Sequence, residues 1–289
     1  MKKFFGYSAY ALCSLVFFLA ILFPGDQAGK YVEMRLSKAL GMDVSMASLA
    51  PAGLFTVRMD NPGLRDAEGY LVRADKVKVS SGPLSLIRKR PDVELSAQAY
   101  GGEVDGRFTA SENAKGFDGP YDGRVGFRDI QVETMDAASR IPEPGLVTGL
   151  LSGEFTFTNL SRRVADLEGE GDFTLSSGNL VLWSGIVAGM TIPFDEMHMM
   201  LSVKNGKIDI KECLIKGELV RSRFSGSIRM GKSASQSRVN IQGSMEPSRS
   251  FFESGIGTLA NRFLGNKKAG DSIPFTVSGA LDDIRFVPK

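Results

Sequence analysis

Alternation of apolar and polar residues runs through most of this chain, and it constrains the fold more than any other feature. In the segment 220–230 every second residue is apolar or small, and the residues between them are arginine or serine. The segment 239–245 repeats the pattern, and Asn205-Gly206 is typical of a tight hairpin turn. A period of two is that of a β-strand with one dry face. The sequence therefore predicts a mainly β protein of roughly fourteen to sixteen short antiparallel strands.

The dry face of the two clearest strands is the candidate lining of a groove. A dry sheet face must be covered by another sheet, by curling of the same sheet or by an apolar ligand, and the sequence leaves all three open. The candidate groove-lining residues are Val220, Phe224, Ile228, Met230, Val239 and Ile241. In a sealed core, truncation of Phe224 to alanine is expected to cost about 3–5 kcal/mol, and in an open groove much less.

Three other segments have helical character. Residues 26–41 are predicted to form an amphipathic helix with Asp26 as its cap and Gly41 just past its end. We expect its apolar stripe to pack on the end of the β domain; this stripe consists of Val32, Leu36, Ala39 and Leu40. A second helix is predicted within 247–264, and a short helix followed by a loop within 133–151.

The first 25 residues are expected to anchor the chain in a membrane. Lys2 and Lys3 precede a run of 22 residues, Phe4 to Gly25, that carries no charge. As a helix this run spans about 33 Å, close to the ~30 Å hydrocarbon core of a bilayer. The lysines place the amino end in the cytoplasm. A cleaved signal peptide and a buried soluble helix are the alternatives. The expected organisation is an anchor at 1–25, a juxtamembrane helix at 26–41 and a β-rich domain at 42–289.

The residue types argue against nucleic-acid binding and against catalysis. Lys and Arg number 35 and Asp and Glu number 33, and this near balance is not that of a nucleic-acid-binding protein. The only histidine is His198, and the chain contains no Gly-x-Ser-x-Gly nucleophile motif. No catalytic residue, metal ligand or cofactor is therefore predicted. Cys13 and Cys213 are not expected to pair, and Cys213 is interpreted as a small buried hydrophobe.

A short basic run, Arg88, Lys89 and Arg90, precedes Pro91. Basic residues at a turn are most simply solvated. The alternative is that these three side chains contact anionic lipid headgroups beside the anchored end of the chain.

Longer stretches resemble those of a known family. The segments LFTVRMDNPGLRD at 54–66 and YLVRADKVKVSSGPLSLIRKRPDVELSAQAYGGEVDGRF at 70–108 resemble the opening module of AsmA-like proteins. The stretch IPFTVSGALDDIRFVP at 273–288 resembles the ending of the same superfamily. The length, the single anchor and the order of these pieces are most similar to the type II secretion system protein N family.

The resemblance implies a fold, a location and two possible roles. The fold is a single transmembrane helix followed by a long curled antiparallel sheet, a groove or open barrel, with an amphipathic helix near each end. The protein would be held in the inner membrane with its bulk in the periplasm. It would act without catalysis in type II protein secretion by docking on other secretion-system subunits. The alternative is binding or transfer of phospholipid in an apolar groove. With 289 residues the chain is too short to span a periplasm alone.

Overall fold

The structure is a computed structural model that describes most of the chain. The described residues are 24–66, 69–82, 92–111, 120–136, 147–160, 167–181, 191–231, 236–254, 267–280 and 283–288. The expected anchor, except for its last two residues, lies outside this set, as do the basic run at 88–90 and residues 137–146 and 255–266.

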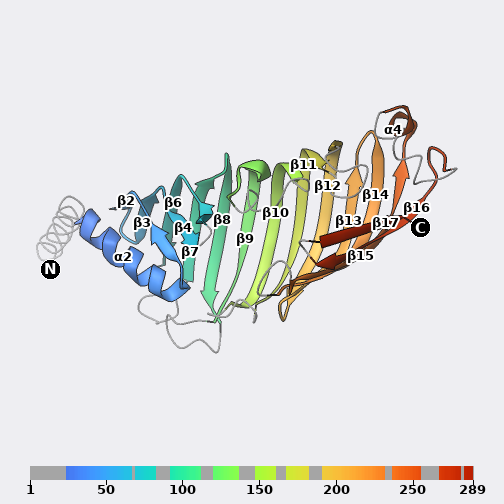
Figure 1. Ribbon diagram of the computed structural model, residues 1–289. Helices are drawn as coiled ribbons and strands as arrows, with labels where there is room; N and C mark the ends of the chain where they lie inside the picture. The colour runs from blue at the N-terminus through green and yellow to red at the C-terminus, as the bar shows by residue number, and fades with distance from the viewer. Residues whose placement is uncertain are drawn as a thin grey trace, which may run out of the picture.

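One antiparallel sheet of fourteen strands dominates the fold (Figure 1). Apart from the step from β3 to β6, each strand pairs with its neighbours in the sequence. The mainly β prediction is confirmed, and the sheet is not closed: β2 and β17 form its two edges. The strands in spatial order are β2 (Ser48–Pro51), β3 (Thr56–Asp60), β6 (Lys76–Ser81), β7 (Asp92–Ala99), β8 (Gly102–Ala110), β9 (Tyr121–Gln131), β10 (Val147–Leu160), β11 (Glu168–Val181), β12 (Thr191–Lys204), β13 (Lys207–Lys216), β14 (Val220–Arg229), β15 (Arg238–Pro247), β16 (Ile273–Ala280) and β17 (Asp283–Pro288).

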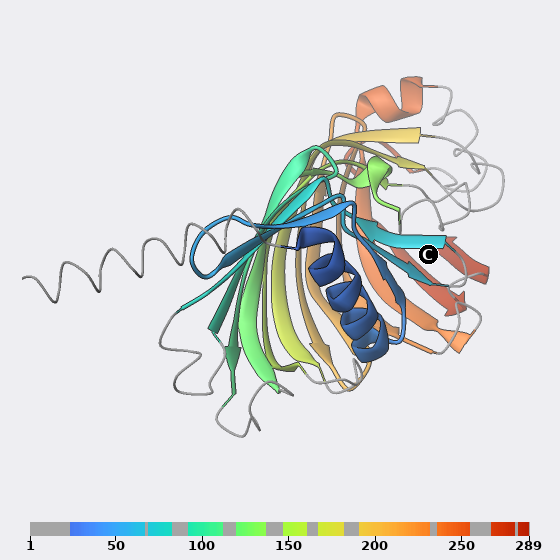
Figure 2. The same ribbon diagram turned by 90° about the vertical axis from the view of Figure 1, so that its left-hand side faces the viewer.

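The strands are longer and less regular than the sequence pattern predicts. The central strands β10, β11 and β12 have 14 residues each. Asp129 in β9 and Ser177 in β11 have positive φ angles of 54° and 52° and lie where the pairing register shifts. Such bulges bend a strand and increase its twist. They contribute to the curvature of the sheet in Figure 2.

A smaller sheet of three strands combines β1 (Asp43–Ser45), which precedes β2 in the chain, with β4 (Gly63–Asp66) and β5 (Gly69–Arg73), which lie between β3 and β6 in the sequence. Its spatial order is β1, β4 and β5. Arg73 at the end of β5 forms an ion pair with Asp136, with 2.6 Å between Nη2 and Oδ1. The hydroxyl of Tyr100, in the turn between β7 and β8, donates to the same carboxylate at 2.7 Å. These contacts fasten the small sheet to the large one.

The first described helix, α2 (Gly25–Leu40), ends as predicted at Gly41, whose φ is 68°. Asp26 is not its cap: the helix begins at Gly25 without a side-chain cap, and Asp26 lies in the first turn. The predicted packing face is wrong for Leu36 and Leu40, which are exposed, whereas Val32 is half-buried. The side chain of Ala39 is not described.

The α2 residues that meet the β-strands carry hydrogen-bond acceptors instead. Glu33 Oε1 accepts from the Met46 N–H at 2.7 Å, and Ser37 Oγ accepts from the Val44 N–H at 2.9 Å. Gly29, one turn before Glu33, lies close to Leu49 of β2, with 3.7 Å between the side chain and the position a Cβ would take. Backbone donors next to the helix thus determined its orientation, because a buried N–H needs an acceptor.

The second described helix, α4 (Arg249–Glu253), is shorter than the predicted 247–264 segment. Ser248 caps it through its Oγ, which accepts from the Phe251 N–H at 3.2 Å. Phe251 is buried against Val220 and Ile273, where it covers one end of the sheet. In the 133–151 segment the described helix is one 3₁₀ turn, η2 (Val132–Thr134), and β10 begins at Val147.

Candidate functional site: an uncovered apolar face

One face of the large sheet, called here the apolar face, carries apolar or glycine residues in register across all fourteen strands. A single row of paired residues crosses the whole sheet from edge to edge. Its members are Pro51, Val57, Val79, Leu95, Gly106, Val125, Phe155, Gly171, Leu201, Ile210, Gly226, Ile241, Val277 and Phe286.

A second row lies beside the first from β9 to the last strand. Its members are Phe127, Gly153, Phe173, Met199, Cys213, Phe224, Gly243, Phe275 and Pro288. Neither row contains a charged residue or a polar side chain other than the thiol of Cys213. The two rows together form a continuous hydrocarbon-like strip.

Phenylalanine and glycine residues face each other across neighbouring strands of the apolar face. Gly153 lies between Phe127 and Phe173, whose ring centroids are 6.0 Å apart, and Gly243 lies between Phe224 and Phe275, at 6.4 Å. Strands two apart in a sheet are separated by about 9.6 Å. The rings therefore lean toward each other over the intervening glycine. The glycines leave the space that the rings fill on the apolar face.

No described element forms a second layer over the centre of this face. Among the described elements, the extensive contacts join neighbouring strands, α2 with β1 and β2, and η2 with β10. Some side chains of this face, such as Phe157 beside Phe108, are buried by their neighbours. Others stay half-buried, among them Phe155, Phe173, Met199 and Leu201. As far as the described residues show, these half-buried side chains are accessible to water or to a ligand.

The opposite face is charged and solvated. Cross-strand ion pairs join Lys216 to Glu196 and Arg128 to Glu103, both at 2.7 Å. The Lys216 ammonium lowers the pKa of Glu196 from its usual value. Pairs this exposed contribute little stability each, but they keep the outer face polar. The predicted wet-face residues Arg221, Arg223 and Arg229 are exposed here.

Most of the predicted lining residues lie on the apolar face, and one does not. Phe224 pairs with Cys213 and Gly243, Ile228 pairs with Val239, and Ile241 pairs with Gly226. Val220 also follows this face, but it is buried against α4.

Met230 is the exception, because β14 ends one residue earlier. The Met230 N–H donates to the Gly206 carbonyl in the neighbouring turn, and the side chain is 52% exposed. The alternating pattern predicted Met230 as a lining residue, but the residue lies beyond the end of β14. Whether Arg88, Lys89 and Arg90 contact headgroups falls outside the described residues.

The part of the face on β9 to β12 was not among the predicted lining residues. A signal for it was present, since glycine alternates with phenylalanine in 153–157 and 169–173. Cys213 was missed for another reason. Both Ile210 and Cys213 face the apolar side because the register shifts between them, which simple alternation cannot reveal.

The two candidate reactive side chains have ordinary surroundings. Cys213 is fully buried, and burial raises the pKa of its thiol to about 12, so the thiolate nucleophile does not form near neutral pH. His198 lies on the outer face with Nε2 2.7 Å from Asp172 Oδ1. Among the described residues, no three His, Cys, Asp or Glu side chains are grouped so that they could hold a metal ion.

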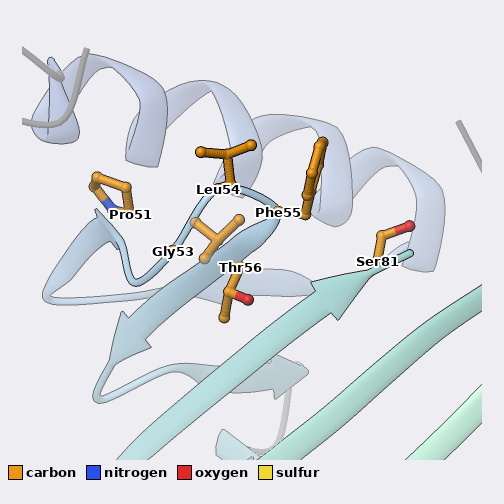
Figure 3. A pocket seen from close by; sticks show the side chains of 7 residues that line it. Pro51, Gly53, Leu54, Phe55, Thr56 and Ser81 are labelled. Atoms are coloured by element: carbon orange, nitrogen blue, oxygen red, sulfur yellow. The ribbon is translucent and has the colours of Figure 1, made fainter. Parts of the chain in front are cut away.

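A small apolar pocket lies at the N-terminal end of the apolar face (Figure 3). Its volume is about 330 Å³, and its lining includes Pro51, Leu54, Phe55, Val57 and Ser81. Pro51 and Val57 are the first two members of the row that crosses the sheet. The pocket is therefore where this row reaches the edge of the molecule.

No helix within the described ranges is both long and apolar enough to cross a membrane. Comparisons with protein-family models, with curated proteins and with solved structures find no match to this chain.

Proposed function

We propose that the apolar face binds the acyl chains of phospholipids. The observation that carries this proposal is the row from Pro51 to Phe286, which crosses fourteen strands without a charged side chain. An apolar surface of this extent is costly to leave in water. Acyl chains would cover it without needing hydrogen-bond partners, and the face offers none through its side chains.

The dimensions of the apolar face fit lipid chains. Thirteen steps between fourteen strands at about 4.8 Å each give a length of roughly 60 Å. A bilayer's hydrocarbon core, which holds two acyl chains end to end, is about 30 Å thick. The face therefore has room for several chains along its length. The AsmA-like resemblance supports the same role, with the chain anchored by residues 1–25 in the inner membrane and the sheet in the periplasm.

Docking in a type II secretion apparatus is the second candidate function, and one of the two edges of the sheet favours it. At the N-terminal edge β2 has four residues, ends in Pro51 and contacts α2, which are features that block strand addition. At the other edge β17 has no partner strand on its outer side among the described residues, and Phe286 and Val287 are exposed. A partner subunit could add a strand there.

The two functions can be separated by cross-linking in cells. A photo-reactive benzoyl-phenylalanine is placed in the full chain at 155, 173 or 201 on the apolar face. The matched controls are 156, 174 and 202, the next residue along each strand, which faces outward. If the apolar face binds lipid, radiolabelled phospholipid will attach at the first three positions and not at the controls.

Two results would contradict lipid binding. One is equal labelling of both faces, which would mean non-specific contact with the membrane. The other is attachment of a protein in place of lipid at the apolar positions, which would favour docking. For docking at the edge, a photo-reactive residue at 287 is expected to capture a secretion-system subunit.

A further inference from the structure

The exposed apolar side chains gather at one end of the molecule. Eleven large hydrophobic residues are exposed in the described part of the chain, and six of them lie on α2 or on the loop between β2 and β3. The six are Tyr31, Met34, Leu36, Leu40, Leu54 and Phe55. Figure 2 looks onto this end and shows α2 lying across it. A concentration of this kind marks an interaction surface.

The outward side of α2 combines apolar and basic residues. Because Glu33 and Ser37 face the strands, Tyr31 and Arg35, about half a turn from Glu33, point outward. The exposed residues beside them include Met34, 60% exposed, and Lys38. Arg35 donates from Nε to the Tyr31 hydroxyl at 3.0 Å, and its guanidinium lies 5.3 Å from the centre of the Tyr31 ring. Tyrosine, methionine and basic side chains together suit the boundary between headgroups and acyl chains.

The charge of α2 favours anionic lipid. Its basic residues Lys30, Arg35 and Lys38 are all exposed. Of its two acidic residues, Glu33 accepts a hydrogen bond from the Met46 backbone and lies on the strand side. Asp26, the other acidic residue, lies two turns before Glu33 on the same side of the helix. The outward face is therefore positively charged, and its basic residues are attracted to an anionic surface.

The position of α2 in the chain points to the same occupant. The uncharged run Phe4 to Gly25 ends at the first residue of the helix, so no linker separates the two. If the run enters a bilayer, α2 begins at the surface of that bilayer.

The loop beside the pocket adds two apolar side chains. Leu54 is 67% exposed and Phe55 is 40% exposed, and Figure 3 shows both pointing the same way from the loop. Both line the pocket in which the row of the apolar face begins.

We propose that this end of the molecule docks on an anionic lipid surface. The basic outward face of α2 lies among the headgroups, and the side chains of Leu54 and Phe55 enter the boundary between the headgroups and the acyl chains. The pocket then opens at the bilayer, where an acyl chain can pass from the membrane onto the apolar face. The entry of an acyl chain rests on the proposed function, whereas the docking itself does not.

The docking is tested by the depth of single fluorescent labels. In a full chain carrying Cys13→Ala and Cys213→Ala, an environment-sensitive dye is attached to Met34→Cys or Phe55→Cys. Met230→Cys is the matched control, since it is similarly exposed but lies far from α2 along the sheet. The chain is reconstituted into phosphatidylcholine vesicles with or without phosphatidylglycerol, each containing brominated lipid as a quencher.

We expect strong quenching at positions 34 and 55, more of it with phosphatidylglycerol, and little at 230. Changing Lys30, Arg35 and Lys38 together to glutamate is expected to abolish the effect of phosphatidylglycerol. Absence of quenching at 34 and 55, or equal quenching at 230, would overturn the proposal.

Failure of the docking and failure of lipid binding give different results. With Leu54→Ser and Phe55→Ser combined, lipid from vesicles should reach a photo-reactive residue at 155 severalfold more slowly. The final extent of labelling should be unchanged when lipid is supplied in detergent. If position 155 never labels while 34 and 55 are quenched, the docking stands and lipid binding fails. If position 155 labels and the double variant loads at the normal rate, entry through this end is excluded.

Discussion

At the scale of single residues, the glycines of the apolar face are as informative as the phenylalanines. A Cβ at Gly243 would lie 2.5 Å from the Phe224 Cβ, and one at Gly171 would collide with the Phe173 ring. The missing side chains let large rings lie over neighbouring strands, a known way to rescue glycine in a sheet. Alternation in the sequence predicted which residues share a face. It could not predict that rings two strands apart meet, because this depends on pairing between distant segments.

Phe224 provides a measure of how open the apolar face is. It is half-buried, whereas Phe251 in the end cluster is 4% exposed. We expect Phe251→Ala to lower the free energy of unfolding by about 3–5 kcal/mol, as in a sealed core, and Phe224→Ala to cost clearly less. Urea denaturation of the full-length variants measures both. Equal losses would mean that the face at Phe224 is closed by something packed on it.

Cys213 should be inert in the folded protein. Burial raises the pKa of its thiol from 9.0 to about 12, so folding favours the protonated form. The resulting stability is fully present below pH 9 and is lost as the pH rises toward 12. We expect no reaction with thiol reagents at neutral pH until the protein is unfolded, and Cys213→Ala should lose less stability than the parent on going to alkaline pH. Rapid labelling of Cys213 in the native state would show that the face opens beneath Phe224.

At the scale of elements, the sequence predicted the features that depend on the periodicity of a single segment. It failed for the features that depend on how two elements pack or pair. The helix at α2 and its end at Gly41 follow from local spacing and from the left-handed freedom of glycine. Its orientation does not, because the Val44 and Met46 backbone donors required Ser37 and Glu33 as acceptors. The apolar stripe including Leu36 and Leu40 was left exposed as a result. The register shift at Cys213 is likewise a property of a strand pair and not of one strand.

The contacts of Asp136 with Arg73 and Tyr100, called here the clamp between the two sheets, should be sensitive to acid. The hydrogen bond from Arg73, followed by that from Tyr100, lowers the pKa of Asp136 below its usual 3.8. Its stabilising effect is therefore present above pH 3.8 and is lost as the pH falls through the lowered value. Asp136→Asn should release the small sheet already at neutral pH, seen as faster hydrogen exchange in β4 and β5 with β10 to β12 unchanged. Asp209→Asn, on an exposed outer-face pair, is the control. Uniform exchange across both sheets would contradict the assignment of Asp136 as a local clamp.

At the scale of the whole molecule, the sequence was sufficient to predict an antiparallel sheet, but not the extent of its apolar face. Short-range turns such as Asn205-Gly206 predict that neighbouring strands pair, and thirteen pairings in this sheet are antiparallel. Where the face begins and ends depends on what covers each edge. Pro51 and α2 limit it at one side, and Phe286 carries it to the last strand at the other.

The pairing of each strand with its neighbours in the chain also makes length an adjustable property of this architecture. From β6 onward no strand of the large sheet depends on a partner distant in the sequence, so a hairpin can be gained or lost as a unit. Each hairpin adds or removes about 9.6 Å of sheet without changing the registers on either side. Duplication of a gene segment that encodes one hairpin could thus lengthen the sheet by two strands at a time.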